Sequence, residues 1–472
     1  MNARALPRVC VIGAGSSGIA TAKVLHERGI PFDVYEKSDR VGGNWVFGNV
    51  NGMSSSYRSL HINTSRERME YSDFPMPKSY PDFPHHTQIA EYFDAYVDHF
   101  GFRDAIRFGV GVDRIARRED GGWDVTLSTG ETMAYGAVAV ANGHHWDPRW
   151  PEPPFPGHDT FAGEQIHAHH YRSEEQLDGR DVVVLGMGNS AMDIAVDASY
   201  HAAHTYLAAR RGAHVIPKYL FGRPIDQIGG AEWVPGWVRF PLFRLMLRLA
   251  VGSMETYGLP RPDHRFAQAH PTISGRILDR LAHGAITAKP NIAALEGDRV
   301  RFVDGTSVHA DLVVYCTGYR ISFPFLDPAV LAAPDNEVPL YRHVFHPDVE
   351  GLYFVGLVQP LGAIMPVAER QSALIADHLE GRHALPPAAE MHRSVRRERA
   401  RMRRRYVASK RHTIQVDYDD YMRALTRERE AGARRVASPL AGPRSAGPRS
   451  TGAAGAGPAH SASTSSPGRT GA

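Results

Sequence analysis

The sequence predicts an α/β protein made of two parallel-sheet domains, with the second domain inserted into the first. Two stretches, residues 9–28 and 181–202, share one order of features: an apolar strand, a glycine-rich turn and a helix with apolar periodicity. Each stretch leads into another strand, at residues 31–36 and 204–211. Such βαβ beginnings are typical of Rossmann-like dinucleotide-binding domains, so we expect two of them in one chain.

Two later strand patterns indicate where the domains divide. The first covers residues 312–316 and ends in Thr317-Gly318, and the second covers residues 352–355. We therefore expect the chain to leave the first domain near Asn142-Gly143 and to return to it near Thr317-Gly318. We predict that residues 1–156 form the first part of the first domain and that residues 157–319 form the inserted domain. Residues 320–436 are then the second part of the first domain with C-terminal helices, and residues 437–472 are a disordered tail.

Three segments lie outside the alternation of strands and helices. Residues 218–274 are rich in Trp, Pro and other aromatics, which favours a helical excursion packed on the inserted domain, with a substrate-facing lid as the alternative. Substrate-pocket walls are expected from this stretch and from residues 359–366. The arginines of residues 393–411 indicate the solvated face of a helix. Residues 437–472 consist mainly of Ser, Pro, Gly, Ala and Arg, which cannot bury enough apolar surface to order a chain.

Composition excludes several classes of protein. A net charge of +3 over 472 residues does not suit a chain built to neutralise phosphates of nucleic acid. The two cysteines, Cys10 and Cys316, form no C-x-x-C pair and cannot build a disulfide framework. The sequence carries no secretory signal pattern and no apolar run of the roughly 18 residues that a membrane span requires. We therefore expect a cytoplasmic protein without a membrane anchor.

The first glycine motif, Gly13-x-Gly15-x-x-Gly18, opens a helix directly after a strand. In such motifs the glycines allow a tight turn, close approach of a pyrophosphate and close packing of helix on strand. Glu36 ends the next strand, where a carboxylate accepts ribose hydroxyls and repels a 2′-phosphate, so FAD or NAD is favoured. Further cofactor contacts are expected from residues of the turn and of the segment after Glu36: Ser16, Ser17, Lys37, Arg40, Gly43, Asn44 and Trp45.

The second glycine motif differs at the position that reads the ribose. Here the turn residues are Gly186, Gly188, Asn189, Ser190 and Ala191, with alanine in place of the third glycine. The next strand ends in Ala209-Arg210-Arg211 instead of an acid, and guanidinium groups favour a 2′-phosphate. NADPH is therefore predicted here, although the two arginines read alternatively as ordinary surface charge.

Between the two motifs lies Phe161-x-Gly163-x-x-x-His167-x-x-x-Tyr171, which resembles the signature of the flavin-containing monooxygenases. The resemblance extends over residues 8–425 and includes further matching segments: residues 60–84, 317–319, 353–356 and 359–360. It implies that NADPH reduces FAD, that reduced flavin and O2 form a hydroperoxide, and that one oxygen atom passes to a soft nucleophile, an amine nitrogen or a sulfide sulfur. The implied partners are O2 and a small-molecule nucleophile, with a homodimer as one option for assembly.

The resemblance also implies roles for individual residues. Asn63 is placed against the flavin, where a neutral amide offers both a donor and an acceptor. Without the family match, the alternative interpretation of Asn63 is a turn-forming residue before Thr-Ser. His167 and Tyr171 are expected to hold the connection between the domains. Further cofactor contacts are expected from residues in the matching segments: His61, Thr64, Thr317, Gly318, Tyr319 and Gln359.

Other interpretations of the sequence remain open. A Baeyer–Villiger monooxygenase has a similar signature that ends in Trp, where this chain has Tyr171, and it needs a deprotonated peroxide, usually with an arginine beside the flavin. An NADPH oxidase would release hydrogen peroxide at the full rate of NADPH use, and a redox-sensing binding protein would hold both nucleotides with slow turnover. Adjacent histidines, at residues 85–86, 144–145 and 169–170, do not predict a metal site, because neighbours on a strand point apart.

Overall fold

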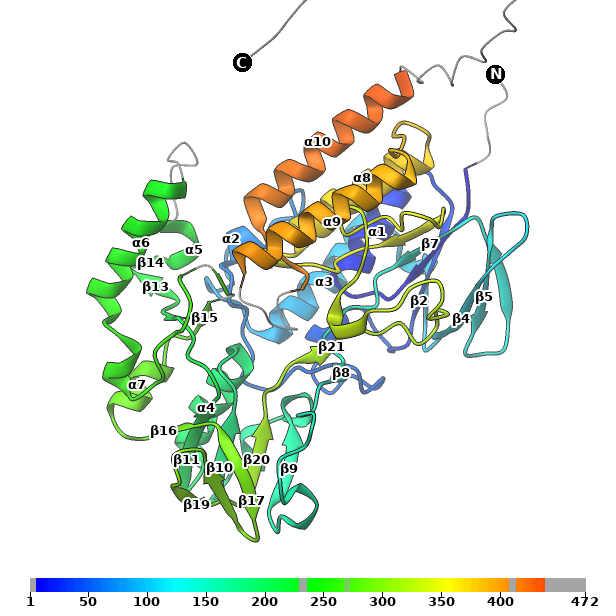
Figure 1. Cartoon of the computed structure of the whole chain (residues 1–472). Helices are drawn as coiled ribbons and strands as arrows, with labels where there is room; N and C mark the ends of the chain where they lie inside the picture. Colours follow the sequence, from blue (N-terminus) through cyan, green and yellow to red (C-terminus); the bar gives the residue numbers. More distant parts are fainter. Residues whose placement is uncertain (1–5, 229–235, 267, 270, 407–412, 438–472) are drawn as a thin grey trace, which may run out of the picture.

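The computed structural model of the chain describes residues 6–228, 236–266, 268–269, 271–406 and 413–437. It contains two five-stranded parallel sheets, one in the upper and one in the lower part of Figure 1. Apart from Ala437, which ends the last helix, the predicted disordered tail lies outside the described residues. The predicted fold class, two Rossmann-like units in an α/β chain, is confirmed.

The first sheet has the strand order β22-β7-β1-β2-β3, and all its pairings are parallel. The strands predicted around residues 9–12, 31–36 and 352–355 are present. Strand β3, which no clear sequence pattern indicates, is three residues long and lies at the edge next to β2. The strands have the following bounds: β1 Val9–Ile12, β2 Phe32–Glu36, β3 Ile106–Phe108, β7 Ala137–Val140 and β22 Leu352–Phe354.

This sheet is covered on both faces, which explains why its central strands are continuously apolar. Val9 and Val11 face a core shared with three helices, whereas Cys10 and Ile12 face a core shared with an antiparallel sheet. The helices are α1 Ser16–Glu27, α3 His86–Phe100 and α8 Met365–Leu379. The antiparallel strands are β4 Val112–Arg117, β5 Trp123–Leu127 and β6 Thr132–Tyr135.

The second sheet repeats the parallel pattern, with the strand order β16-β11-β10-β20-β9. Helix α4, Asn189–His201, follows β10 in the way that α1 follows β1. A small antiparallel sheet follows β16 along the chain and consists of β17 Ile292–Glu296, β18 Arg299–Phe302 and β19 Ser307–His309. The strands of the parallel sheet have these bounds: β9 Glu164–His167, β10 Asp181–Leu185, β11 His204–Ala209, β16 Thr287–Pro290 and β20 Leu312–Tyr315.

The two passages of chain between the sheets run side by side. Strand β8, Asp147–Pro148, pairs antiparallel with β21, Tyr319–Arg320, and the Arg149 amide donates to the Gly318 carbonyl at 2.9 Å. These contacts lie close to the predicted crossing points at Asn142-Gly143 and Thr317-Gly318. The residue boundaries 156/157 and 319/320 themselves stay a prediction.

Residues 218–274 fold mainly as the expected helical excursion, although residues 229–235, 267 and 270 are outside the described part. The excursion begins with a short hairpin and continues through two helices and a 3-10 turn. A short parallel pair, β12 with β15, ties its two ends together. Its elements are β13 Tyr219–Leu220, β14 Arg223–Pro224, α5 Ile225–Ile228, α6 Gly236–Val251 and η6 Met254–Tyr257, flanked by β12 Val215–Ile216 and β15 Thr272–Ile273, with α7 Ile277–Ala282 next.

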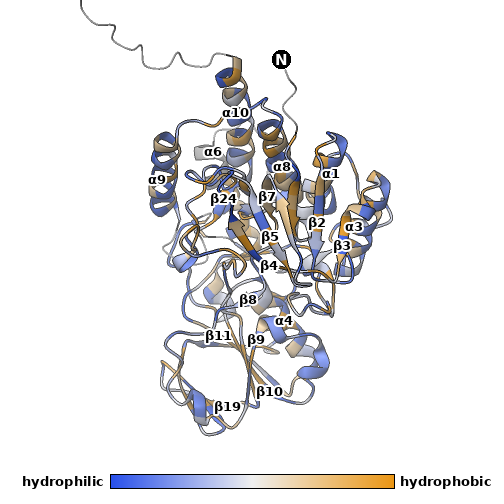
Figure 2. Cartoon of the chain, turned by 90° about the vertical axis from the view of Figure 1, so that its right-hand side faces the viewer, coloured by the Kyte–Doolittle hydropathy of each residue, from blue (hydrophilic) through white to orange (hydrophobic). Residues whose placement is uncertain are grey.

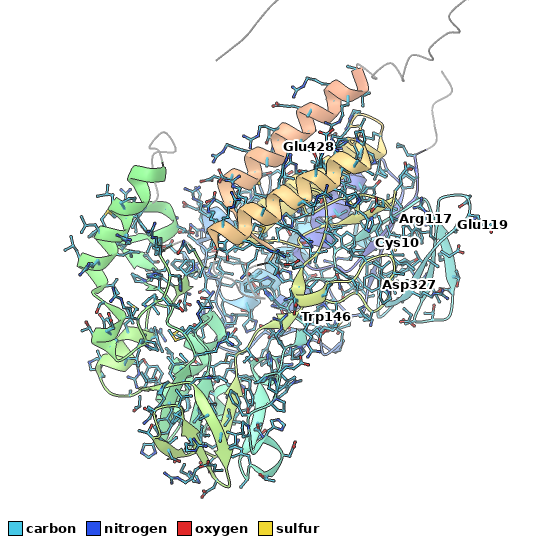
Figure 3. The ribbon with its side chains drawn as sticks, in the orientation of Figure 1. Cys10, Arg117, Glu119, Trp146, Asp327 and Glu428 are labelled. Carbon is cyan, nitrogen blue, oxygen red and sulfur yellow. The ribbon has the colours of Figure 1, made fainter. Side chains whose placement is uncertain are left out.

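The C-terminal helices are α9 Ala388–Arg405 and α10 Tyr418–Ala437, and Figure 2 shows α9 as largely hydrophilic. The arginine-rich stretch is therefore a solvated helix face as predicted, up to Tyr406; residues 407–412 lie outside the described part. On α10, the buried Glu428 accepts hydrogen bonds from Tyr341, His383 and Arg435, which anchors this helix (Figure 3). Within the described part of the chain, none of the helices has the length and apolar composition of a transmembrane segment.

Candidate functional site

The first glycine turn requires glycine at two of its three motif positions. Gly13 has a φ of +99°, and a Cβ there would lie 2.8 Å from the carbonyl oxygen of Ala141. A Cβ on Gly18 would lie 1.8 Å from the Gly13 carbonyl oxygen, so helix α1 could not pack on the turn. A Cβ on Gly15 would make only ordinary contact with Gly43, at 3.6 Å from its Cα atom. Gly15 is therefore not needed for the fold, and its backbone is open to a ligand.

Glu36 closes the turn from the end of β2. Its Oε2 accepts a hydrogen bond from the Ala14 amide at 2.7 Å, and its Oε1 accepts one from the Ser38 amide at 2.8 Å. The Asn51 side-chain amide adds a longer bond of 3.4 Å to Oε1. Burial raises the pKa of Glu36, while these three donors oppose that shift by stabilising the carboxylate. The acid is thus held beside the glycine turn, with its two oxygens at the strand end.

A cavity of about 350 Å³ joins this turn to the segment at Gln359. Gly15 and Gly43 approach closely at its wall, since a Cβ on Gly43 would lie 3.0 Å from the Gly15 Cα. The cavity brings together most of the residues predicted for the first nucleotide, from the turn, the end of β2 and the second glycine pair: Gly13, Gly15, Ser16, Ser17, Glu36, Lys37, Gly43, Asn44, Trp45 and Gln359.

Several predicted cofactor residues do not line this cavity. Gly18 lies beneath the turn, and the Arg40 guanidinium is exposed and pairs with Asp39 at 3.0 Å. Asn63 and its neighbours His61 and Thr64 also lie outside the lining. For these five residues, contact with the cofactor stays a prediction.

Other lining residues were missed by the sequence analysis: Asn51, Met53, Asn142, His144, His145, Trp146, Pro324 and Phe325. Trp146, labelled in Figure 3, donates its indole N–H to the Gly143 carbonyl just before β8. Asn142 could have been found, because it comes two residues after β7, at the carboxyl edge of a parallel sheet where ligands bind. The others belong to loops that only the fold brings to this edge.

The second glycine turn has the same construction with one exception. Gly186 has a φ of +147°, and a Cβ there would lie 2.8 Å from the Cys316 carbonyl oxygen. Gly188 is the N-cap of α4, so Asn189 and Ser190 stand in the first turn of that helix, where free amides favour an anion. The Asn189 side chain is partly committed, because its Oδ1 accepts the Ile273 amide at 3.0 Å. Ala191, buried at the third position, completes the turn.

Register shows which residue replaces Glu36 in the second sheet. Ile12 pairs with Tyr35 in the first sheet and Leu185 pairs with Ala208 in the second, so Ala209 takes the place of Glu36. Arg210 and Arg211 follow at the strand end and are both exposed. Arg211 already has a partner, since its Nε donates to Asp263 at 2.6 Å.

The signature residues lie in the second half of the molecule, and the ring of Tyr171 also lies 5.7 Å from that of Tyr57 of the first half. Phe161 packs in the core behind the second sheet, and a Cβ on Gly163 would lie 2.6 Å from the Ala310 carbonyl oxygen. His167 is fully buried at the end of β9, and burial lowers its pKa to about 4. Tyr171 is also fully buried, and its hydroxyl donates to Asp197 of α4 at 2.9 Å.

The segment at residues 317–319 lies at the crossing between the sheets. The Thr317 hydroxyl donates to the Arg149 carbonyl, and the ring of Tyr319 lies 5.3 Å from that of His167. None of the three residues lines the cavity at the first turn. The structure therefore shows Thr317, Gly318 and Tyr319 in the connection between the halves, and their contact with a cofactor stays a prediction.

Asn63 has an unusual environment for an amide. Its Oδ1 is buried and has no hydrogen-bond partner among the described residues. The peptide groups on both sides are held: Lys218 donates to the Ile62 carbonyl at 3.1 Å, and Asp226 accepts the Ser65 amide at 2.6 Å. A buried polar atom without a partner is costly, which makes Asn63 a candidate contact for a bound ligand.

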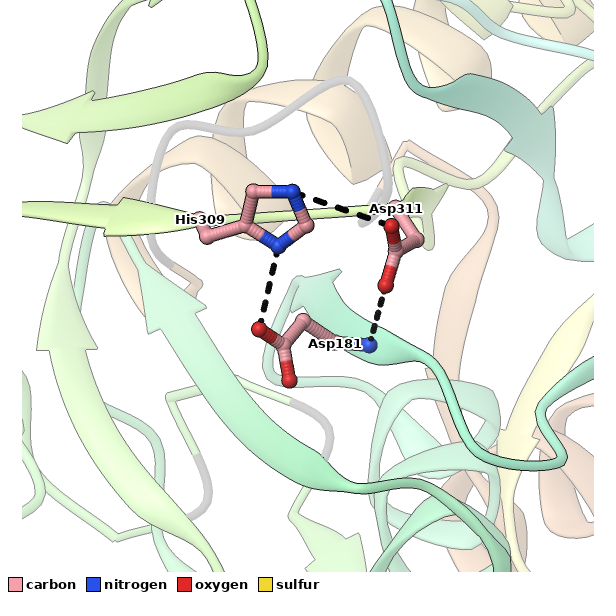
Figure 4. A group of neighbouring side chains, drawn as sticks. All are labelled: Asp181, His309 and Asp311. Carbon is pink, nitrogen blue, oxygen red and sulfur yellow. Dashed lines mark hydrogen bonds and ion pairs between the residues drawn. The ribbon is translucent and has the colours of Figure 1, made fainter.

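A cluster of Asp181, His309 and Asp311 lies at the other end of the second sheet (Figure 4). Asp181 accepts hydrogen bonds from the rings of His204 at 2.6 Å and His309 at 3.1 Å, and Asp311 accepts the Asp181 amide at 2.8 Å. These contacts use the carboxylate oxygens. Asp181 begins β10 and Asp311 directly precedes β20, so the cluster lies at the N-terminal ends of these strands, whereas the second glycine turn follows the C-terminal end of β10. The three residues form an ion-pair cluster that links the N-terminal ends of β10 and β20.

The site fits the two dinucleotides that the sequence predicts. The first turn offers an open backbone at Gly15, a cavity and an acid at the ribose position, as FAD requires. The second offers a helix N-terminus and two exposed guanidinium groups at Arg210 and Arg211, as a 2′-phosphate requires.

Comparisons with known proteins agree with this arrangement. Residues 6–444 match the model of a family described as flavin-binding monooxygenase-like. Flavin-containing monooxygenase 5 of Oryctolagus cuniculus is 36% identical over 439 residues, and the N-oxide-forming dimethylaniline monooxygenase 2 of Pan troglodytes is 33% identical over 445 residues. Each alignment covers 89% of this chain and 82% of the relative.

Solved structures give the same picture. S-allyl-L-cysteine S-oxygenase of Allium sativum has a TM-score of 0.68 at 27% identity, covering 92% of this chain and 93% of that one. The open form of cyclohexanone monooxygenase has a TM-score of 0.70 at 18% identity, covering 91% and 98%, and shows a shared fold. The length of the family match and the identity to curated relatives decide the matter: the chain belongs to the flavin-containing monooxygenases and is an oxidoreductase that uses FAD and NADPH.

Proposed function

We propose that this monooxygenase transfers one atom of O2 to a soft nucleophile, an amine nitrogen or a sulfide sulfur, of a small organic molecule. The balanced reaction consumes substrate, O2, NADPH and a proton, and yields the N-oxide or S-oxide, NADP⁺ and water. FAD, when bound, supplies the redox and oxygen chemistry, so the protein needs no nucleophilic side chain.

The observation that carries this proposal is the environment of Asn63. The peptide groups on both sides of it are held by hydrogen bonds, yet its Oδ1 is buried without a partner among the described residues. A rigid, neutral amide can hold a proton or a polar ligand atom in place without drawing that atom into an ion pair. We assign Asn63 to orient the reacting groups and to exclude water from them.

The two nucleotide sites have separate roles in this proposal. The first turn with Glu36 binds the FAD nucleotide, because the carboxylate at the strand end accepts ribose hydroxyls. Arg210 and Arg211 bind the 2′-phosphate of NADPH, which the neutral Ala209 does not repel. The ion pair of Arg211 with Asp263 is exposed and weak, so a doubly charged phosphate can replace it.

A Baeyer–Villiger reaction is the second candidate, and the described site favours it less. None of the described residues that line the cavity is an arginine; its cationic side chain is Lys37. Tyr171 stands where the signature of that group has Trp. The likeness to cyclohexanone monooxygenase is at 18% identity and concerns the fold.

The decisive experiment offers three substrates to the FAD-loaded enzyme with NADPH and ¹⁸O2. The probes are dimethylaniline, S-allyl-L-cysteine and cyclohexanone, chosen because relatives and neighbours carry these names. We expect labelled N-oxide or S-oxide in an amount that matches the NADPH consumed. A labelled lactone alone would replace the proposal by the Baeyer–Villiger reaction, and hydrogen peroxide alone by the NADPH oxidase.

The proposal also includes a cytoplasmic location and a homodimeric assembly. Light scattering on the purified protein measures the assembly, and a monomeric mass would remove that part. The oxygenation reaction itself does not depend on either statement.

A further inference from the structure

Helix α4 carries two carboxylates that accept hydrogen bonds from residues of the first half of the chain. Asp193 and Asp197 are one turn apart and lie on the same side of the helix. The Tyr57 hydroxyl donates to Asp193 at 2.6 Å, and the Ser59 hydroxyl donates to Asp197 at 2.6 Å. Both hydroxyls belong to the segment before Asn63, which is 130 or more positions earlier in the chain.

The signature tyrosine shares this contact. Tyr171 donates to the same oxygen of Asp197 that Ser59 uses, at 2.9 Å. The rings of Tyr57 and Tyr171 lie 5.7 Å apart, and both side chains are almost completely buried. Two carboxylates and two phenols are thus enclosed between the signature segment, α4 and residues 57–59.

The partial burial of these carboxylates is hard to explain by stability alone. Removing a carboxylate from water is costly, and apolar side chains of similar size often serve stability as well or better. What hydrogen-bonded acids provide instead is a defined geometry between the groups that they join. The geometry defined here is that between α4, which begins at the second glycine turn, and the segment that leads to Asn63.

The same segment is held further along by the excursion of the second half. Lys218 donates to the Ile62 carbonyl and Asp226 accepts the Ser65 amide, on either side of Asn63. Residues 57–65 are therefore fixed at four points by α4 and by residues 218–226, which both follow far later in the chain. Asn63 lies between the last two of these points.

We propose that Asp193 and Asp197 are positioning residues for the oxygen transfer, which hold the Asn63 segment in register with the NADPH-binding half through Tyr57, Ser59 and Tyr171. The inference rests on the proposed function of Asn63. It also explains why the signature ends in a tyrosine here. The Tyr171 hydroxyl, which phenylalanine would not supply, fixes the carboxylate that Ser59 also binds.

The test compares small changes at these contacts in the FAD-loaded enzyme. The variants are Tyr171→Phe, Ser59→Ala, Asp197→Asn, Asp197→Ala and the double variant Tyr171→Phe with Asp197→Ala. The matched control is Asp178→Asn, because Asp178 is exposed and pairs with His201 at the far end of α4. Measured quantities are FAD content, Tm, the NADP⁺ dissociation constant and hydrogen peroxide formed per NADPH with saturating methyl phenyl sulfide.

We expect Tyr171→Phe and Asp197→Ala to keep FAD and to raise both the peroxide fraction and the NADP⁺ dissociation constant, by about tenfold for the loss of a hydrogen bond to a charged group. Asp197→Asn, which keeps an acceptor oxygen, should recover most of this loss. The double variant should be no worse than Asp197→Ala, because both changes break one contact. The control should match wild type.

Three results would overturn the inference. Tyr171→Phe could leave the peroxide fraction and the NADP⁺ affinity unchanged, the variants could lower Tm with unchanged peroxide fraction, or the double variant could be additive. If wild type itself forms no sulfoxide, the proposed function fails, and the NADP⁺ dissociation constants alone then decide the inference. An affinity that differs between Asp197→Ala and the control would then show that Asp197 holds the two halves in register, without a role in oxygen transfer.

Discussion

Ala209 occupies in the second sheet the position that Glu36 occupies in the first, one residue beyond the strand pairs Leu185–Ala208 and Ile12–Tyr35. The two turns are otherwise built alike, with a glycine in positive φ before a helix. A carboxylate at this position in the first sheet and a methyl group in the second therefore predict that the first site repels a 2′-phosphate and the second tolerates one.

The first prediction follows from this equivalence. Ala209→Glu should reduce the preference for NADPH over NADH by about tenfold or more, because a carboxylate beside Arg210 repels the phosphate and neutralises its partner. The measurement is kcat/KM for flavin reduction by each nucleotide. Ala209→Gln, of the same size without the charge, is the control; an equal loss in both variants would show that crowding at this buried position is the cause.

The second prediction separates the glycines of the first turn. Gly15→Val should give folded protein without FAD, since a Cβ at Gly15 fits and the longer side chain would occupy the cavity. Gly18→Ala should instead lower Tm, because its Cβ would meet the Gly13 carbonyl oxygen at 1.8 Å. Absorbance of bound flavin and thermal unfolding of the apoprotein measure the two effects. Stoichiometric FAD in Gly15→Val would contradict the assigned site.

The third prediction concerns Asn63. Asn63→Ala should keep FAD and its reduction by NADPH, and should divert consumed NADPH to hydrogen peroxide, because the held amide is lost while both nucleotide sites remain. Single-turnover reduction and product yield measure the two steps separately. Asn63→Asp is the informative companion: it keeps the shape and adds a charge in a buried place, so it should impair oxygenation as well. Unchanged product yield in Asn63→Ala would remove the residue from the mechanism.

Local patterns were enough to predict two parallel sheets, their nucleotide turns and six of their strands: β1, β2, β10, β11, β20 and β22. Strand β1 with its turn, and β10 with its turn, are contiguous in sequence, although the contacts that require Gly13 and Gly186 come from Ala141 and Cys316, after later strands. Strands β3, β7, β9 and β16 were not predicted, because each is three or four residues long and none opens a glycine turn and helix as β1 and β10 do.

The contacts around the Asn63 segment could not be predicted from sequence. Tyr57 and Asp193 are 136 positions apart, and Ser59 and Asp197 are 138 apart, so their meeting depends on how the two halves pack. Asp193 and Asp197 read as the polar face of an amphipathic helix, which normally means contact with solvent. The sequence shows that the two acids are one helical turn apart, but it does not show which residues donate hydrogen bonds to them.

The last prediction uses the pH dependence of Asp193. Burial raises the pKa of Asp193 to about 6, and the negative charge of Asp197 contributes to this increase. The hydrogen bond from Tyr57 and the positive charge of Lys218 lower the pKa and oppose this shift. Lys218 comes from the excursion and Tyr57 from the first half, and the Cys316 thiol also lies near; burial raises the pKa of that thiol, so it stays neutral. A carboxyl with a raised folded-state pKa binds more protons folded than unfolded between about pH 4 and pH 6.

The free energy of unfolding should therefore fall as pH rises through this window, and the fall should be absent in Asp193→Asn, which does not titrate. Thermal unfolding of both proteins from about pH 4 to about pH 7.5 measures the difference, which should favour wild type most at the acid end. Asp178→Asn, an exposed change near the same helix, should follow the wild-type curve. If wild type and Asp193→Asn kept a constant difference across the range, Asp193 would be ionised throughout and its burial would be less complete than the contacts with Tyr57 and Lys218 indicate.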